Sequence, residues 1–497
     1  METKNETYVL ALDLGTSSVK SSIVSDRGRI VDTASYEYAS SQSCGNRVEQ
    51  NPDAWWAGSV SVIRELLKRN AGMGNRIEAI GASGHMLGCL PVDKRGAWLR
   101  PAMIHSDSRA GLEAERVADV IDRDLLYKYT GNILGAQSSL CKVLWLLRNE
   151  PSIYKKTERF LQSKDYLVSK LTGNIDTSDF SDASHAQFIN IHTKKYLEDL
   201  FKELSLDAGK FPLLRKSADI AGVLSDEAGK ATGLPGGIPV IAGGGDGACA
   251  NLGAGLASGS ENSYCCLGTT AWIAHSSKTP VIDPKSRLFD IVALDGESYA
   301  VYGTVQSAGK SVEWACDLFG LANGREFDMV ASAVEPGSGG LIFLPYIEGE
   351  RSPVFDSKAR GLFFYVSSAH GKDHFVRSVL EGVCYALKNV FDVFLESVNI
   401  PELRAVGGGA GSGLWKGVLA DALGRRLWTI DTPPGADTSL GAALAAFVGV
   451  GVFKNIDEAA ALVSLSEKTE PCPENRETYE RQYKKYLRLY PSIKELY

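Results

Sequence analysis

A run of three glycines followed by an acid, Gly243-Gly244-Gly245-Asp246, ends one of the strands that the sequence predicts. Open α/β sheets bind ligands at the ends of their strands, and glycines let a ligand approach the backbone closely. An aspartate is ionised at neutral pH and can accept the proton of a hydroxyl group that attacks phosphorus. Asp246 is therefore a candidate general base. The alternative is a surface aspartate that caps the following helix.

Two turns share a glycine-threonine pair, Gly15-Thr16 and Gly268-Thr269. Such a turn between strands exposes backbone N–H groups and a hydroxyl, which suit a phosphate oxygen, although a tight hairpin alone also explains the glycine. Asp13 precedes the first turn and is a candidate to attract Mg²⁺, through water because Mg²⁺ dehydrates reluctantly. Cys266 stands at the equivalent place before the second turn, so only the first copy keeps an acid.

Glycines also mark the starts of two predicted helices. Gly309 follows a strand over residues 299–305 and opens a helix whose free N–H groups favour an anion, with a plain helix cap as the alternative. Residues 407–413 form a second glycine-rich strand-to-helix turn, but no register in it satisfies GxGxxG, which disfavours a dinucleotide-binding dehydrogenase. A Walker A loop is disfavoured as well, because Thr304 stands where that pattern requires glycine.

The segment from Gly81 to His85 resembles the GxSxG turn of serine hydrolases, with Ser83 at the nucleophile position. The last glycine of that pattern is replaced by His85. A serine hydrolase is thus a rival class of enzyme, although no later histidine has a context that favours it as the catalytic base.

The elements that must position these groups alternate between strands and helices, which predicts an α/β fold. Residues 8–14, 19–25 and 29–36 are predicted to form an antiparallel meander. Residues 263–275 repeat the strand, Leu-Gly-Thr turn and strand layout of residues 9–24, so the two halves look like copies. Further strands are predicted at residues 77–82, 238–242 and 404–406, and helices at residues 55–69, 140–148, 164–171 and 414–423.

The chain of 497 residues is too long for one compact core, and we place a domain boundary at the glycine run, giving domains 1–245 and 246–497. Its 53 Lys and Arg against 60 Asp and Glu give a net charge of -7, which disfavours a nucleic-acid binder. The polar start over residues 1–7 shows no secretory signal, and the apolar run 440–453 is too short to span a bilayer and predicts a buried helix. Nine cysteines without a CxxC pair fit reduced thiols, so we expect a cytoplasmic protein without membrane or nucleic-acid partners.

The order and spacing of these motifs resemble those of the FGGY family of carbohydrate kinases, and within it the xylulokinases. The resemblance covers nearly the whole chain. It rests on Asp13-Leu14-Gly15-Thr16, Gly243-Gly244-Gly245-Asp246, Leu267-Gly268-Thr269-Thr270 and Gly407-Gly408-Gly409-Ala410. Further matching segments are residues 49–52, 55–56, 344–346, 349–353, 380–383 and 440–443.

The resemblance implies two actin-like, ribonuclease H-like domains with ATP between them and a sugar deep in the cleft. By the same resemblance Asp246 is the catalytic base and Asp13 supports Mg²⁺. Positions that would contact the nucleotide are Thr16, Gly268 and Thr269 at the phosphates, Gly309 and Glu313, and Gly409 and Gly413 in the adenosine loop.

The sugar-binding motifs depart from the xylulokinase pattern. Its Gln-Met-His-Gly segment is His85-Met86-Leu87-Gly88 here, so Leu87 replaces the histidine expected to bind sugar. The family's Trp-x-Asp-x-Arg keeps Asp107 and Arg109 but has His105 in place of tryptophan. Since an unpaired buried hydroxyl costs roughly 1 to 3 kcal/mol, these exchanges should alter selectivity. His85 and His105 either restore polar contacts to the substrate or are satisfied structural histidines.

These observations predict an ATP- and Mg²⁺-dependent kinase that phosphorylates a terminal hydroxyl of a small sugar by direct in-line transfer. D-xylulose, giving D-xylulose 5-phosphate, is the first candidate, and another ketose, a polyol or a sugar acid is the alternative. An actin-like ATPase that binds a partner protein, and the serine hydrolase, are more distant alternatives. A homodimer is compatible with the sequence.

Overall fold

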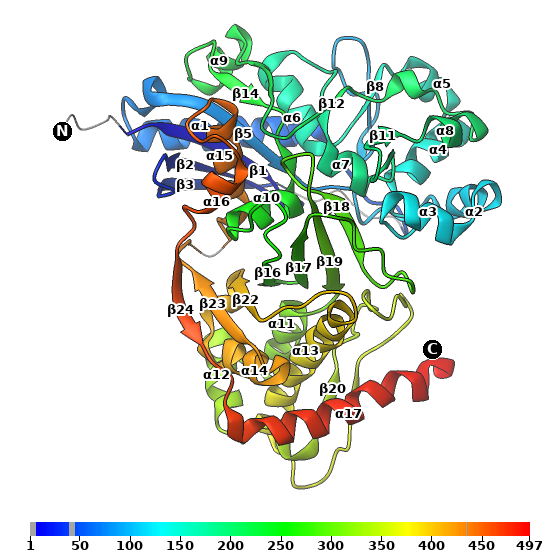
Figure 1. Ribbon diagram of the computed structural model, residues 1–497, viewed down its shortest axis with the longest axis vertical. Helices are drawn as coiled ribbons and strands as arrows, with labels where there is room; N and C mark the ends of the chain where they lie inside the picture. The colour runs from blue at the N-terminus through cyan, green and yellow to red at the C-terminus, as the bar shows by residue number, and fades with distance from the viewer. Residues whose placement is uncertain (1–5, 39–44, 434) are drawn as a thin grey trace.

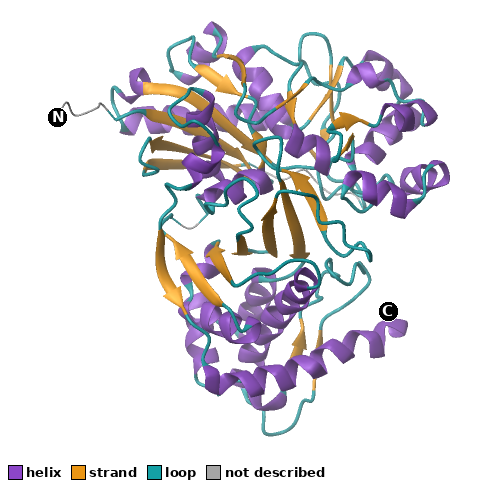
Figure 2. Ribbon diagram, viewed as in Figure 1, coloured by secondary structure: helices purple, strands orange, loops and turns teal. Residues whose placement is uncertain are grey.

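The computed structural model describes residues 6–38, 45–433 and 435–497, which form two seven-stranded sheets with helices on their faces (Figures 1 and 2). Residues 1–5, which contribute to the argument about a secretory signal, lie outside the described residues. Within the described part of the chain, every helix is too short or too polar to cross a membrane.

The first sheet begins with the predicted meander. Strand β1 lies between β2, which is antiparallel to it, and β5, which is parallel to it. The order across the sheet is β13 (Ile220–Val223), β14 (Pro239–Ile241), β5 (Ile77–Gly84), β1 (Tyr8–Leu14), β2 (Ser18–Ser25) and β3 (Ile30–Glu37), and β15 (Gly244–Gly245) pairs with the end of β5.

The second sheet has the same connectivity. Strand β16 pairs antiparallel with β17 and parallel with β22, as β1 pairs with β2 and β5. Its order is β18 (Phe289–Val292), β19 (Tyr299–Val305), β17 (Ala271–Ser277), β16 (Ser263–Leu267), β22 (Glu402–Val406), β23 (Arg426–Ile430) and β24 (Leu465–Thr469). The predicted duplication is confirmed, with the two Gly-Thr turns joining β1 to β2 and β16 to β17.

Opposite faces of the first sheet carry helices from different parts of the chain. Helix α1 (Pro52–Arg69) packs against β2 and β3, and its start is set by Pro52 and by the Asn51 side chain, which accepts a hydrogen bond from the Asp53 N–H. Helix α15 (Asp437–Gly449) packs against β1 and β5 from the other side. In Figure 1 the orange α15 lies beside the blue strands of the first sheet, although it follows the second sheet in sequence. The predicted buried helix over residues 440–453 is thus confirmed as α15.

Glycines let α15 touch helix α10 (Asp246–Gly253) along their backbones. A Cβ atom on Gly441 would lie 1.9 Å from the Cys249 carbonyl oxygen, and one on Gly253 would lie 1.8 Å from the Asp437 carbonyl oxygen. Both distances are far inside van der Waals contact, so only glycine allows this approach. This packing fixes the N-terminal ends of α10 and α15, which carry Asp246 and Asp437, relative to the first sheet.

Helices α13 (Lys372–Leu395), α11 (Gly309–Phe319) and α14 (Gly413–Leu423) enclose the core of the second sheet, and α17 (Arg476–Ile493) packs beneath them (Figure 1). The region between β7 (Ala102–Met103) and β13 adds helices to the first half. They are α2 (Gly111–Val120), α3 (Arg123–Thr130), α4 (Ser139–Asn149), α5 (Pro151–Lys156), α6 (Ser163–Thr172), α7 (Phe180–His185) and α8 (Glu198–Glu203).

Candidate functional site

A cavity of about 470 Å³ lies between the two halves of the chain. Thr16, His85 and His185 from the first half line it, and so do Thr270, Tyr302 and Arg351 from the second. Asp246, at the junction, also lines it. The volume is in the range of small-molecule sites. A crevice beside Asp246, which the kinase hypothesis requires, is therefore present.

Asp246 is the first residue of α10 and directly follows β15. Its Oδ1 accepts a hydrogen bond from the Gly247 N–H at 2.8 Å. Burial raises the pKa of the Asp246 carboxyl to about 6, and the Gly247 N–H opposes that rise. A carboxylate with this pKa is mostly ionised at neutral pH but far more basic than an exposed aspartate, as a general base should be. The alternative of a surface helix cap does not hold, because the side chain faces the cavity.

The two Gly-Thr turns differ in what they offer to a ligand. In the first turn, the Gly15 N–H donates to the Ser18 carbonyl at 2.9 Å, and Thr16 lines the cavity. In the second, Thr270 rather than Gly268 or Thr269 lines the cavity.

The start of α11 does not offer the free N–H groups expected from the sequence. The Gly309 N–H donates to the Gly268 carbonyl at 2.9 Å, and the Lys310 N–H donates to the Thr269 carbonyl at 3.1 Å. The expectation of an anion at these amides was wrong, because the second turn already occupies them. Glu313, one turn further along α11, is exposed.

Two further acids accompany Asp246. Burial, with the charges of Asp246 and Asp437, raises the pKa of Asp13 to about 7, while Lys20 opposes the rise. Burial also raises the pKa of Asp437, the first residue of α15. Three acids near one lysine leave excess negative charge, which a divalent cation would neutralise.

No group of three or more ligating side chains could hold a metal by itself in the described part of the chain. Mg²⁺ characteristically keeps several waters and binds through one or two carboxylates plus substrate phosphates, so Asp13 and Asp437 suit it without a protein cage. The sequence did not predict Asp437. Its only available signal was its place just before residues 440–443, which carry part of the family resemblance.

Two residues that line the cavity carry buried polar atoms without a hydrogen-bond partner in the described part of the chain. His85 is 2% exposed, and neither of its ring nitrogens has a hydrogen-bond partner among the described residues. Trp55 packs edge-on against the imidazole at 5.2 Å between ring centroids. Oε1 of the fully buried Gln187 also lacks a partner within the described ranges. Buried polar atoms are nearly always paired, so these atoms point to a polar ligand, and His85 is not a satisfied structural histidine.

Two more imidazoles line this cavity: His105, which the sequence singled out together with His85, and His185, which the sequence missed. Burial lowers the pKa of His85 to about 3, that of His105 to about 4 and that of His185 to about 3. Neutral imidazoles each offer one donor and one acceptor, which suits hydroxyl groups. His185 lies in a different chain segment from His105, and no motif used in the sequence analysis distinguishes it.

Lys142 stabilises the backbone of the same cavity wall by hydrogen bonds to two of its carbonyl groups. Lys142, fully buried on α4, donates to the carbonyl oxygens of Leu87 and Ile104, both at 2.7 Å. Leu87 lines the cavity with a left-handed φ of 59°, beside Met86. The segment predicted to contact sugar is thus at the cavity, held there by an ammonium group.

Asp107 and Arg109 lie elsewhere. The Arg109 guanidinium binds the Asp107 carboxylate and reaches Glu49 at 2.6 Å, and the Asp107 carboxylate also accepts from the Val48 N–H at 2.7 Å. Neither residue is among those that line the cavity, because each binds the other.

The glycine-rich turn after β22 forms a separate, smaller cavity of about 80 Å³ together with Asp437. Its 3₁₀ turn spans Gly408–Gly411, and a Cβ on Gly409 would lie 2.8 Å from the Trp415 ring. Gly413 begins α14 in open space. The turn is therefore placed beside the acid that also approaches Asp13.

Ser83 is fully buried within β5, and its hydroxyl has no hydrogen-bond partner in the described portion of the chain. A serine nucleophile must stand exposed on a sharp turn beside a histidine. The serine hydrolase alternative is therefore not supported.

Comparisons with known proteins agree with this geometry. Residues 8–253 match the N-terminal domain, and residues 263–450 the C-terminal domain, of the FGGY family of carbohydrate kinases. The chain is 33% identical to a xylulose kinase of Lactococcus lactis over 99% of this chain and 98% of that protein. It is 26% identical to a gluconokinase of Bacillus subtilis over 95% of this chain and 93% of that protein. The crystal structure of a xylulose kinase from Rhodospirillum rubrum superposes with a TM-score of 0.88 at 29% identity, covering 98% of this chain and 99% of that one.

Proposed function

The chain belongs to the FGGY family of carbohydrate kinases, and from this premise we propose that it transfers the γ-phosphoryl group of ATP to a terminal hydroxyl of D-xylulose. The observation that carries the proposal is the Asp246 carboxylate on the wall of a cavity that also presents unpartnered polar atoms. Full-length similarity to xylulose kinases supports D-xylulose as the acceptor.

Asp246 acts as the general base. Its ionised carboxylate accepts the proton of the acceptor hydroxyl while that oxygen attacks the γ-phosphorus, and the bond from phosphorus to the ADP oxygen breaks in line. The products are the sugar phosphate and ADP. His85, Gln187 and the other polar groups of the wall orient the sugar, with their free donors and acceptors paired to its hydroxyls.

The nucleotide lies along the two turns. Thr16 and the Gly268-Thr269 turn contact the phosphates, Gly409 and Gly413 face the adenosine, and Gly309 and Glu313 lie beside it. Asp13 and Asp437 would hold Mg²⁺, in part through water because Mg²⁺ dehydrates reluctantly. When bound, Mg²⁺ neutralises charge on the phosphate oxygens. Burial and the charges of Asp246 and Asp437 raise the pKa of Asp13 in the protein alone, and a cation held there would oppose that rise.

Domains 1–245 and 246–497 close over the two substrates and exclude water that would otherwise accept the phosphoryl group. The described cysteines are free, which fits an enzyme of the cytoplasm.

A coupled assay of ADP release with D-xylulose tests the proposal. We expect Asp246→Asn to lower kcat by about 10²- to 10⁴-fold, the usual contribution of a general base, with ATP affinity unchanged. Activity within a few-fold of the parent protein would remove Asp246 from the base role.

A sugar acid is the second candidate acceptor. Arg351 lines the cavity, and its charge adds to burial in lowering the pKa of His105 and His185, so a guanidinium is available there to bind a carboxylate. Similarity to a gluconokinase is in keeping with this candidate. Comparing kcat/KM for D-xylulose and D-gluconate in the same assay decides between them.

A further inference from the structure

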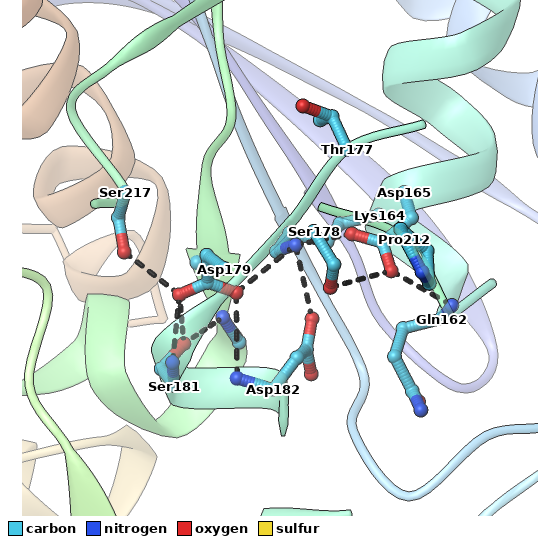
Figure 3. A network of polar contacts seen from close by, with 12 residues as sticks. Gln162, Lys164, Asp165, Thr177, Ser178, Asp179, Ser181, Asp182, Pro212 and Ser217 are labelled. Carbon is cyan, nitrogen blue, oxygen red and sulfur yellow. Dashed lines mark hydrogen bonds and ion pairs between the residues drawn. The ribbon is translucent and has the colours of Figure 1, made fainter. Parts of the chain in front are cut away.

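A buried network lies behind the segment that carries Asp246. Lys164, on α6, is fully buried and contacts three carboxylates, those of Asp165, Asp179 and Asp182 (Figure 3). The Nζ atom lies 3.0 Å from Oδ1 of Asp179 and 3.2 Å from Oδ2 of Asp182. Burial raises the pKa of Asp182 well above its ordinary value, and the charge of Lys164 opposes that rise.

Asp179 connects this charge cluster to two serines. Its Oδ2 accepts hydrogen bonds from the Ser181 hydroxyl at 2.5 Å and from the Ser217 hydroxyl at 2.8 Å (Figure 3). The Ser181 N–H also donates to this oxygen at 2.9 Å. All of these side chains are buried, so the carboxylate is held rigidly.

The same two serines hold the glycine run from both ends. The Ser181 hydroxyl oxygen accepts a hydrogen bond from the Gly245 N–H at 2.9 Å. The Ser217 carbonyl oxygen accepts one from the Gly243 N–H, also at 2.9 Å. Gly245 immediately precedes Asp246. Because Gly245 has no side chain, Met86 packs against it: a Cβ on residue 245 would lie 2.4 Å from the Met86 methyl group.

We infer that Ser181 and Asp179 are positioning residues for the proposed general base, setting the place of Asp246 through the Gly245 N–H. The inference rests on the proposed function. Glycines give the 243–245 segment wide conformational freedom, so its position must be imposed from outside. The Ser181 hydroxyl donates to Asp179 and accepts from Gly245 at once, and the charged acceptor strengthens both hydrogen bonds.

The cluster contains a matched control. The Ser178 hydroxyl donates to Oδ2 of Asp165 at 2.9 Å, and Ser178, like Ser181, is buried. No hydrogen bond joins Ser178 to residues 243–245 within the described ranges. Ser178→Ala therefore removes a comparable hydrogen bond to a carboxylate of the same lysine, without touching the Asp246 segment.

The experiment compares Ser181→Ala, Ser178→Ala and Ser181→Thr by steady-state kinetics with D-xylulose and by amide hydrogen exchange of residues 243–253. We expect Ser181→Ala to lower kcat about 10- to 100-fold, since small displacements of a catalytic group have effects of this order, with KM for D-xylulose within about threefold. Exchange at the start of α10 should rise in the same variant. Ser178→Ala should leave kcat within about threefold, and Ser181→Thr, which keeps the hydroxyl, should restore most of kcat.

The outcomes separate this inference from the proposed function. Two results with an active parent protein would overturn the inference alone. In the first, Ser181→Ala and Ser178→Ala lower kcat equally. In the second, Ser181→Ala leaves the hydrogen exchange of residues 243–253 unchanged. A parent protein that releases no ADP with any sugar would overturn the proposed function, and the inference with it. Loss of kcat and of exchange protection in Ser181→Ala alone supports the inference.

Discussion

The acids around the first Gly-Thr turn should make the protein less stable than its packing allows. The negative charges of Asp246 and Asp437 act on the Asp13 carboxyl, and the positive charge of Lys20 opposes them. We expect Asp13→Asn to stabilise the metal-free protein at pH 8 while weakening Mg²⁺-dependent turnover. The substitution removes one negative charge and keeps the size of the side chain.

The magnitude follows from the pKa. The pKa of Asp13 rises from 3.8 to about 7 on folding. At about 1.4 kcal/mol per pH unit, this shift lowers the free energy of unfolding of the protein by roughly 4 kcal/mol at pH 8. Between these two pH values the folded state holds a proton that the unfolded state has released, so stability falls as the pH rises and the loss is complete above about pH 7. Asparagine still buries a polar amide, and residue 13 is only partly buried, so we expect a net gain of about 1 to 2 kcal/mol.

Thermal unfolding at pH 5 and pH 8, without Mg²⁺ and nucleotide, measures the effect. The midpoint should rise by about 2 to 5 °C at pH 8 and by less than half as much at pH 5. Asp119→Asn, which alters an exposed acid on α2, is the control and should change little at either pH. An equal gain at both pH values, or a loss at pH 8, would refute the reasoning about buried charge, and an unchanged Mg²⁺ titration of activity would refute the proposed metal role of Asp13.

Three further predictions follow from individual contacts. The pH profile of kcat/KM should have an acid limb near pH 6, since Asp246 must be ionised to accept a proton; a limb near pH 4 would mean that the base is not buried. Gly441→Ala should lower the free energy of unfolding, measured by urea titration, by about 3 kcal/mol because the new Cβ meets the Cys249 carbonyl. The control Gly417→Ala, where a Cβ on α14 meets no other atom, should raise the free energy of unfolding by about 0.5 to 1 kcal/mol. Equal effects of the two substitutions would contradict the contact between α15 and α10. Lys142→Met should raise KM for the sugar about tenfold and leave kcat within threefold, because the carbonyl oxygens of Leu87 and Ile104 lose their hydrogen-bond donor. Initial rates at saturating ATP measure this effect. An unchanged KM would count against a role of Lys142 in holding the cavity wall.

The strands around the two Gly-Thr turns were predictable because their signals are local, whereas β13, β18, β23 and β24 were not predicted. Alternating apolar residues and the Gly-Thr turns specified the meander, and repetition of the pattern specified the second copy. The signal that singled out Asp246, an acid directly after a run of glycines, was also local in the sequence. The expectation about α11 failed because the partners of its first N–H groups, the carbonyls of Gly268 and Thr269, lie in another part of the chain.

Residue types and their order were sufficient to identify a duplicated α/β scaffold, an acid at a strand end and membership in a kinase family. Tertiary structure alone decided which acids meet, because α15 returns from the second half to place Asp437 near Asp13. It also decided that His85 faces the cavity without a partner, while Asp107 and Arg109 bind one another. Desolvation and charge interactions depend on distances between groups remote in sequence, and those distances exist only once the chain has packed.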